Sequence, residues 1–293
     1  MPRDVNPEDF WVPIVTVFGL QISLFIVAWI IKDNSIVDIF WSIGIALPNL
    51  VVLIVNGNWH HRTIISLILV WLWALRLSIH IGVRHSGEDW RYANWREQWR
   101  NAGGCLLEFV ASLNVVFMLQ GLFMVVVGSS VFFTAIYSDG DDDLFVLEFI
   151  GAFVFLFGLI FEAIGDWQLS RFIKNPENKG HVIQSGLWSI TRHPNYFGEA
   201  VVWWGAYIYA CSIMWGFVTI WSAITITLLL RFVSGVPMLE KKYEDRKEFQ
   251  EYKKRVNIFV PWFPKSKKSV GQVDHSNPIM DDDEKNSKQQ NSS

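Results

Sequence analysis

Charged residues are scarce in this sequence and unevenly spread. Asp, Glu, Lys and Arg make up 18% of the 293 residues, whereas a soluble domain carries about a quarter. The charges gather in short segments and leave uncharged stretches close to the length that crosses a bilayer. Hydrophobic residues account for 51% of the chain, which also contains 16 Trp and 22 Phe. This composition argues against a soluble protein and predicts an all-α, polytopic membrane protein.

Several common functional signatures are also missing. The two cysteines, Cys105 and Cys211, are expected on opposite sides of the membrane, which argues against a disulfide. The first ten residues are polar and mildly acidic, so the first apolar run is expected to stay as a helix rather than be cleaved as a signal. Seven histidines, expected on both sides of the membrane, are too few for a di-iron oxygenase, and we predict no metal site. No GxGxxG follows a predicted strand, which excludes a Rossmann site.

Seven apolar segments are predicted to be membrane helices. They are residues 12–31, 37–55, 63–83, 106–128, 144–164, 199–213 and 215–233. Residues 129–137 could extend the fourth segment. The last two segments are almost contiguous, which predicts a tight helical hairpin around residues 213–216.

The positions of Lys and Arg predict the orientation. Basic residues gather in 84–100, 165–198 and 235–257, whereas the acidic loop 139–143 has none. Seven spans place the three basic regions together, and the positive-inside rule makes that side cytosolic. We therefore expect a lumenal or outside N-terminus and a cytosolic C-terminus. We expect one domain over residues 1–264, and its cofactor-binding half should be about 144–263. Residues 265–293 should be a disordered polar tail.

Polar residues converge at one predicted membrane boundary. The fifth helix is expected to continue past its apolar part and to end at Lys174-Asn175-Pro176, because the residue before proline avoids helical geometry. Pro194 is expected to begin a new helix. Arg192 and His193 precede it, and with the free N–H groups of a helix start they suit a phosphate. Asn195 and Glu199, one turn apart, are placed to bind something polar.

Several motifs in this sequence resemble a known family. The C-terminal motifs are Asp166-Trp167-Gln168, Gly186-Leu187-Trp188, Arg192-His193-Pro194-Asn195-Tyr196-Phe197-Gly198-Glu199, Trp203-Trp204-Gly205 and Ser234-Gly235-Val236-Pro237-Met238-Leu239-Glu240-Lys241-Lys242-Tyr243. The upstream motifs are Asp38-Ile39-Phe40-Trp41, Leu75-Arg76-Leu77, and Arg84 followed by Gly87-Glu88-Asp89-Trp90-Arg91-Tyr92. They are similar to the steroid 5-alpha-reductase-like membrane family, within the isoprenylcysteine methyltransferase-like superfamily, and closest to its broad, largely uncharacterised branch. The resemblance covers about residues 35–263.

The resemblance implies a seven-helix fold, reduction of an activated C=C bond, and NADPH as the hydride source. It also implies a lipid or sterol-like substrate and an endoplasmic reticulum membrane. Carried over residue by residue, the cofactor-binding positions are Asp166, Arg171, Lys174, Asn175, Arg192, His193, Asn195, Tyr196 and Glu199. Arg and Lys suit the phosphates, and Asn195 and Glu199 suit amide or ribose groups.

The proton donor is harder to place. The hormone-converting enzymes of the resembled family use a Glu and a Tyr from the N-terminal half, but their Gln–Glu pair does not align here, which leaves a steroid substrate open. The catalytic candidates are Asp38 and Tyr92. An acid inside a membrane segment is a functional hypothesis by default, although Asp38 could instead cap its helix at the interface. Arg76 and His80, four residues apart, either line the pocket or face a neighbouring helix.

Other functions fit the sequence less well. Membrane methyltransferases that use S-adenosylmethionine are similar over the Arg-His-Pro-x-Tyr-x-Gly stretch, but Arg171, Lys174 and Arg192 favour a cofactor with more phosphates. A transporter or scaffold would need intramembrane charges along a path, and few are present. Nucleic-acid binding has no support, because the basic residues lie at the expected membrane edge.

Overall fold

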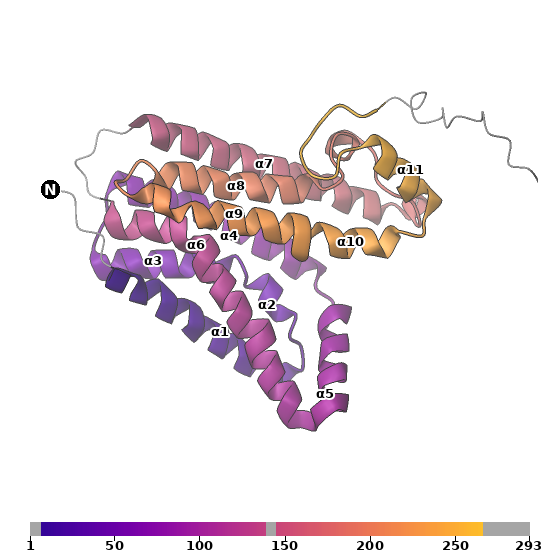
Figure 1. Ribbon diagram of the computed structural model, residues 1–293, viewed down its shortest axis with the longest axis horizontal. Coiled ribbons are helices and arrows are strands. Elements are labelled where there is room, and N and C mark those ends of the chain that lie inside the picture. Colours follow the sequence, from indigo (N-terminus) through magenta and orange to yellow (C-terminus); the bar gives the residue numbers. More distant parts are fainter. Residues whose placement is uncertain (1–6, 139–144, 266–293) are drawn as a thin grey trace, which may run out of the picture.

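The computed structural model describes residues 7–138 and 145–265, and every regular element in these ranges is helical (Figure 1). The predicted acidic loop 139–143 and almost all of the predicted polar tail lie outside the described residues. Five helical runs are long and apolar enough to cross a membrane, namely Trp11–Ile31, His61–Arg84, Trp90–Tyr137, Val146–Lys174 and Gly216–Tyr243. The chain is therefore an all-α, polytopic membrane protein, as predicted.

The described residues 7–138 contain six α-helices. They are α1 (Trp11–Ile31, after the 3-10 turn Pro7–Phe10), α2 (Ile36–Ile39), α3 (Ile43–Asn56), α4 (His61–Arg84), α5 (Trp90–Ala111) and α6 (Leu119–Tyr137), with a π-helical segment, Ser112–Met118, between the last two. The predicted segment 37–55 is thus divided into α2 and α3.

The second described range, residues 145–265, contains five α-helices. They are α7 (Phe145–Lys174), α8 (Pro194–Ala210), α9 (Trp221–Leu228), α10 (Val236–Tyr243) and α11 (Lys247–Arg255). Short 3-10 turns at Pro176–Asn178, Gly186–Ser189 and Gly216–Ile220 and a π-helical segment at Leu229–Val233 connect them. The predictions that the fifth helix ends at Lys174 and that the next begins at Pro194 are confirmed.

Residues 90–100, predicted as part of the basic loop 84–100, are instead helical. The side chain of Asp89 caps α5 by accepting a hydrogen bond from the Arg91 N–H, as N-cap residues do. Gly103 and Gly104 then interrupt the helix, and Gly104 has a φ of 70°, a conformation that favours glycine. The chain changes direction there, so α5 runs across the end of the bundle before the chain enters α6 (Figure 1).

The three basic regions meet at one end of the bundle, where α4 and α7 end, α8 begins, and α5, α10 and α11 lie (Figure 1). We call this the basic end; α1 begins at the opposite end. This arrangement matches the predicted sidedness, and the assignment of the basic end to the cytosol stays a prediction. Cys105 in α5 and Cys211 after α8 are both free thiols.

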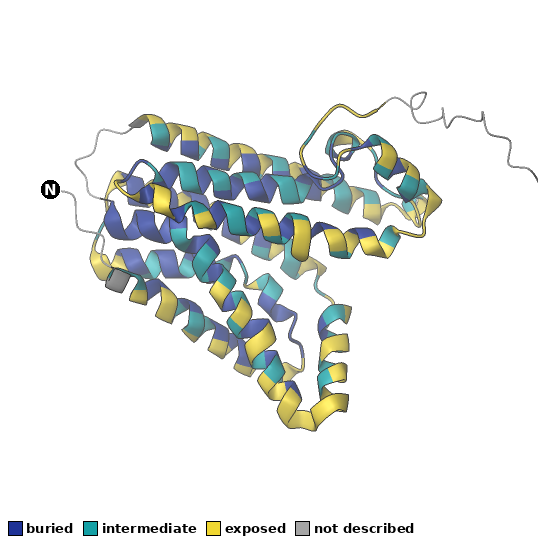
Figure 2. Cartoon of the chain, in the orientation of Figure 1, coloured by how far each residue is buried: buried dark blue, intermediate teal, exposed yellow. Residues whose placement is uncertain are grey.

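The predicted hairpin between the last two membrane segments is also present. Its turn follows Ala210, and Trp215 adopts a left-handed conformation with a φ of 68°. Gly216 donates its N–H to the carbonyl of Ile213 and lies against the backbone of Ala210. The buried core is inside the bundle, and the outer helix faces are largely exposed (Figure 2). Such apolar outer faces suit lipid contact.

Candidate functional site

A charged cluster joins α4, α7 and α8 near the basic end. The guanidinium of Arg76 forms ion pairs with Glu162 and Asp166 of α7. The amide of Asn195, in the first turn of α8, donates to Asp166 Oδ1 at 3.1 Å. Glu199 is one turn further along α8 and is within electrostatic range of Arg76 and Asp166. We call Arg76, Glu162, Asp166, Asn195 and Glu199 the acidic cluster.

The acidic cluster has unused hydrogen-bonding capacity. It contains three carboxyl groups and one guanidinium, and the residues Glu162, Asp166 and Glu199 are all buried. Among the residues that the structure describes, Glu162 Oε2 and Asn195 Oδ1 are buried and have no hydrogen-bond partner. Leaving a buried polar group unpaired costs about 1–3 kcal/mol, so these two oxygens are candidates for contact with a polar ligand.

The two predicted catalytic residues are hydrogen-bonded to each other. The Tyr92 hydroxyl, on α5, donates to Asp38 Oδ1 at 2.7 Å, and Arg91 donates from Nη2 to Asp38 Oδ2 at 3.0 Å. Gln120 of α6 donates from Nε2 to the Tyr92 hydroxyl oxygen at 3.1 Å. We call Asp38 and Tyr92 the acid–tyrosine pair. The sequence nominated the two residues separately, and α5 brings them together.

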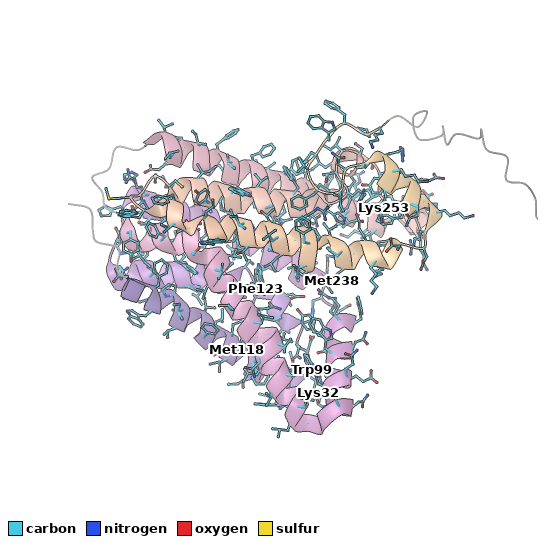
Figure 3. The ribbon with its side chains drawn as sticks, viewed as in Figure 1. Lys32, Trp99, Met118, Phe123, Met238 and Lys253 are labelled. Atoms are coloured by element: carbon cyan, nitrogen blue, oxygen red, sulfur yellow. The ribbon has the colours of Figure 1, made fainter. Side chains whose placement is uncertain are left out.

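A second polar network fixes α5 to the turn after α1. Glu88 accepts a hydrogen bond from the Asn34 backbone N–H at 2.9 Å. Arg96 bridges Glu88 and the buried Glu108, with both ion pairs at 3.0 Å. Lys32 and Trp99 mark this corner of the molecule, opposite the C-terminal segment that carries Lys253 (Figure 3). The network holds the acid–tyrosine pair in place from the α5 side.

Tyr196 lies near both groups. It is on α8 one residue after Asn195, and its hydroxyl is within electrostatic range of the carboxyl groups of Glu199, Asp166 and Asp38 and of the Arg91 guanidinium. Its ring stacks on that of His193 with the centroids 5.7 Å apart. The acidic cluster and the acid–tyrosine pair therefore border one region of the protein.

Arg192 and His193 already have partners inside the protein. Arg192 donates from Nε to Glu240 Oε1 at 2.8 Å and from Nη1 to the Val256 carbonyl at 2.8 Å. His193 Nε2 lies 3.2 Å from the same Glu240 oxygen, and Lys253 Nζ lies 3.8 Å from the other. We call this the Glu240 clamp, because it attaches α10 and the segment after α11 to the start of α8. Burial lowers the pKa of His193, and the hydrogen bond with Glu240 opposes that shift.

The remaining predicted cofactor residues lie at the surface. Arg171, Lys174 and Asn175 are exposed at the end of α7. The Arg171 guanidinium lies 5.6 Å from the centroid of the Trp167 ring. Asn175 accepts the Glu177 N–H at 3.1 Å and so caps a short helix. The structure thus brings Asp166, Asn195, Tyr196 and Glu199 close together. Arg171, Lys174 and Asn175 lie outside the buried cluster.

Three residues that contribute to these groups have no role predicted from the sequence. Glu162 and Gln120 are polar side chains within apolar helices, which is a signal for function in membranes. Glu240 lies in the Ser234–Tyr243 motif, but nothing local in the sequence connects it with Arg192, 48 residues away. Arg76, nominated as a pocket or packing residue, is the central cation of the acidic cluster.

Comparisons with known proteins identify the family. No solved structure matches the chain. A stretch of 79 residues is 38% identical to a protein named "Probable O-methyltransferase ustE" from Ustilaginoidea virens, covering 23% of this chain and 27% of that protein. The chain thus spans about a quarter of that relative. Residues 24–256 match the model of a family described as "Protein of unknown function (DUF1295)", which includes steroid 5-alpha-reductase-like proteins. The match covers most of the sequence, and the chain belongs to the DUF1295 family.

Proposed function

We propose that this protein is a membrane-embedded oxidoreductase that uses NADPH to reduce an activated C=C bond of a lipid- or sterol-like enone. The observation that carries the proposal is the hydrogen bond of 2.7 Å between Tyr92 and Asp38. Reduction of an enone needs a proton donor that polarises the carbonyl while a hydride adds to carbon. A carboxyl group joined to a phenol hydroxyl beside a polar binding region suits that role.

The acidic cluster fits the ribose and amide parts of a nicotinamide nucleotide. Carboxylate oxygens accept hydrogen bonds from ribose hydroxyls, and the unpaired Asn195 Oδ1 can accept one from a carboxamide. The exposed Arg171 and Lys174 at the end of α7 would hold the phosphates. Arg192 is engaged by Glu240, so its predicted phosphate contact would require the Glu240 clamp to open. When bound, NADPH supplies the hydride.

The protein's own groups would carry the proton. Tyr92 would donate to the carbonyl oxygen of the enone, and Asp38 would restore the phenol proton. Arg91, 3.0 Å from Asp38 Oδ2, would stabilise the carboxylate that results. Tyr196, which is within electrostatic range of both the acid–tyrosine pair and the acidic cluster, would lie where substrate and cofactor meet. The apolar helices around this region suit a sterol, a polyprenoid or a long-chain enone, and the family resemblance supports the endoplasmic reticulum membrane.

A methyltransferase is the second candidate, and two observations favour it. The matched relative from Ustilaginoidea virens is named a probable O-methyltransferase. The acidic cluster also has more carboxyl groups than cations, which would suit the positive sulfonium of S-adenosylmethionine. In that reaction Asp38 would accept a proton from the substrate hydroxyl rather than supply one.

Cofactor binding to detergent-purified protein separates the two functions. NADPH, NADH and S-adenosylmethionine are compared by thermal shift on the wild type, Asn195→Ala, Glu199→Gln and the control Asn101→Ala, which changes an exposed amide on α5. The reductase predicts stabilisation by NADPH that is weakened in the two site variants and kept in the control. Stabilisation by S-adenosylmethionine alone would refute the hydride chemistry and assign the same residues to a methyl donor.

A further inference from the structure

Gln120 is an isolated polar residue in an apolar stretch. Residues 115–128 read VVFMLQGLFMVVVG, and Gln120 is the only polar side chain among them. It lies in α6, two residues after the end of the π-helical segment Ser112–Met118, and such segments are frequent at functional sites. A polar side chain within a membrane helix needs a partner. The position of Gln120 therefore calls for a specific contact.

That contact is the hydroxyl of Tyr92. Gln120 Nε2 lies 3.1 Å from the phenol oxygen and donates to it, while the phenol donates to Asp38 Oδ1 at 2.7 Å. A phenol has one proton to give, and its oxygen accepts the other hydrogen bonds. Because the phenol oxygen accepts the hydrogen bond from Gln120, the single phenol proton points away from α6 and towards Asp38.

This arrangement has a consequence for proton supply. While Asp38 is a carboxylate, it holds the phenol proton, and Tyr92 cannot donate to a second acceptor. Once Asp38 carries a proton of its own, it can donate to the phenol oxygen, and the phenol proton becomes free for another group. The Gln120 N–H can also stabilise negative charge that develops on the phenol oxygen as that proton leaves.

We propose that Gln120 is a positioning residue that holds the Tyr92 hydroxyl so that it relays a proton from Asp38 to the substrate carbonyl oxygen. The inference rests on the proposed reductase function. In the relay the Tyr92 O–H bond breaks and its proton bonds to the carbonyl oxygen, balancing the hydride that adds to carbon. The Asp38 O–H bond breaks and its proton bonds to the phenol oxygen. Asp38 remains as a carboxylate beside Arg91 and is reprotonated from solvent.

The hydrogen bond is tested by infrared spectroscopy on nanodisc-embedded protein labelled with ring-4-¹³C tyrosine. The Tyr92 C–O band is identified as the difference between the wild type and Tyr92→Phe. Gln120→Leu should move this band, because the phenol oxygen loses a donor. The matched control is Asn114→Leu, which removes an amide from the π-helical segment that precedes α6. Within the described residues, the Asn114 amide donates to the Val110 carbonyl alone, so its loss should leave the band in place. An unmoved band in Gln120→Leu, or an equal shift in both variants, would overturn the proposal.

Turnover tests the relay itself. NADPH oxidation is followed with a 4-en-3-one sterol, a polyprenal and a long-chain enone. Gln120→Leu should lower kcat by about tenfold or more and leave KM within about twofold, since positioning of the donor acts on the chemical step. Asn114→Leu should match the wild type, and an unchanged kcat in Gln120→Leu would refute the relay. If the wild type reduces none of the three enones while the infrared band moves as expected, the reductase function and the relay fail, and the hydrogen-bonding role of Gln120 stands.

Discussion

Gly158 of α7 lies directly against the backbone of Val202 in α8. A Cβ at position 158 would be 2.6 Å from the Val202 nitrogen and 2.7 Å from the Gly198 carbonyl oxygen. Neither atom belongs to a flexible side chain that could move aside. Glycines at helix contacts of this kind let backbones approach closely within membranes. This close approach sets the spacing between Glu162 and Asp166 on α7 and Asn195 and Glu199 on α8.

We predict that Gly158→Ala lowers the thermal stability of the purified protein and weakens cofactor binding, because α7 and α8 must separate to admit the methyl group. Overpacking of this kind costs about 1–3 kcal/mol. Gly19→Ala is the matched control, since a Cβ at Gly19 would meet nothing within 4 Å. Equal melting temperatures for the two variants would show that the α7–α8 contact is looser than described.

The Glu240 clamp gives a second prediction. Glu240→Gln should destabilise the protein by about 3–5 kcal/mol, because it leaves the buried Arg192 without its charge partner. Thermal unfolding and limited proteolysis of the segment after α10 report this loss. Glu244→Gln removes a carboxylate whose side chain is 60% exposed and lies 3.4 Å from Lys253, so it should change stability by less than about 1 kcal/mol. The prediction fails if both variants behave alike.

The Glu240 clamp also shows what sequence reasoning could reach and what it could not. Apolar runs and basic segments predict the membrane helices, and Pro176 and Pro194 predict where α7 ends and α8 begins. Those signals are local. The contact between Arg192 and Glu240 joins residues far apart in the sequence, so the spacing of Arg192 and His193 before a helix start suggested a phosphate site and gave no sign of the internal carboxylate.

The acidic cluster was also predictable from the sequence only in part. The one-turn spacing of Asn195 and Glu199 places them on one face of α8, and the sequence alone identifies that face. Their approach to Asp166 depends on close packing of α7 and α8, which no single segment encodes. The polar first part of α5 was missed because its Arg, Asn and Gln residues resemble a loop in hydropathy, although the cap at Asp89 is visible in the sequence.

His193 predicts a pH dependence of stability. Its pKa is lowered by burial in the folded protein, and it returns to about 6.5 when the chain unfolds. Between these two values the unfolded chain binds more protons, so stability should fall as the pH drops through 6.5 towards the lowered value and then level off. Thermal melts from pH 7.5 to pH 5 should show a shallower decline for His193→Gln than for the wild type. Parallel curves would contradict this assignment.

Mutations in the acid–tyrosine pair and in the acidic cluster should have different effects on cofactor binding and on turnover. Asp38→Asn and Tyr92→Phe remove the proton donor and leave the acidic cluster intact, so NADPH should still raise the melting temperature while kcat for enone reduction falls by about a hundredfold. Glu199→Gln should instead weaken stabilisation by NADPH, because it removes a buried acceptor for the cofactor. Thermal shift and NADPH oxidation, measured on the same preparations, distinguish the two patterns. If Asp38→Asn abolished cofactor stabilisation while retaining fold and melting temperature, Asp38 would belong to the cofactor site, and the proton donor would have to be sought elsewhere.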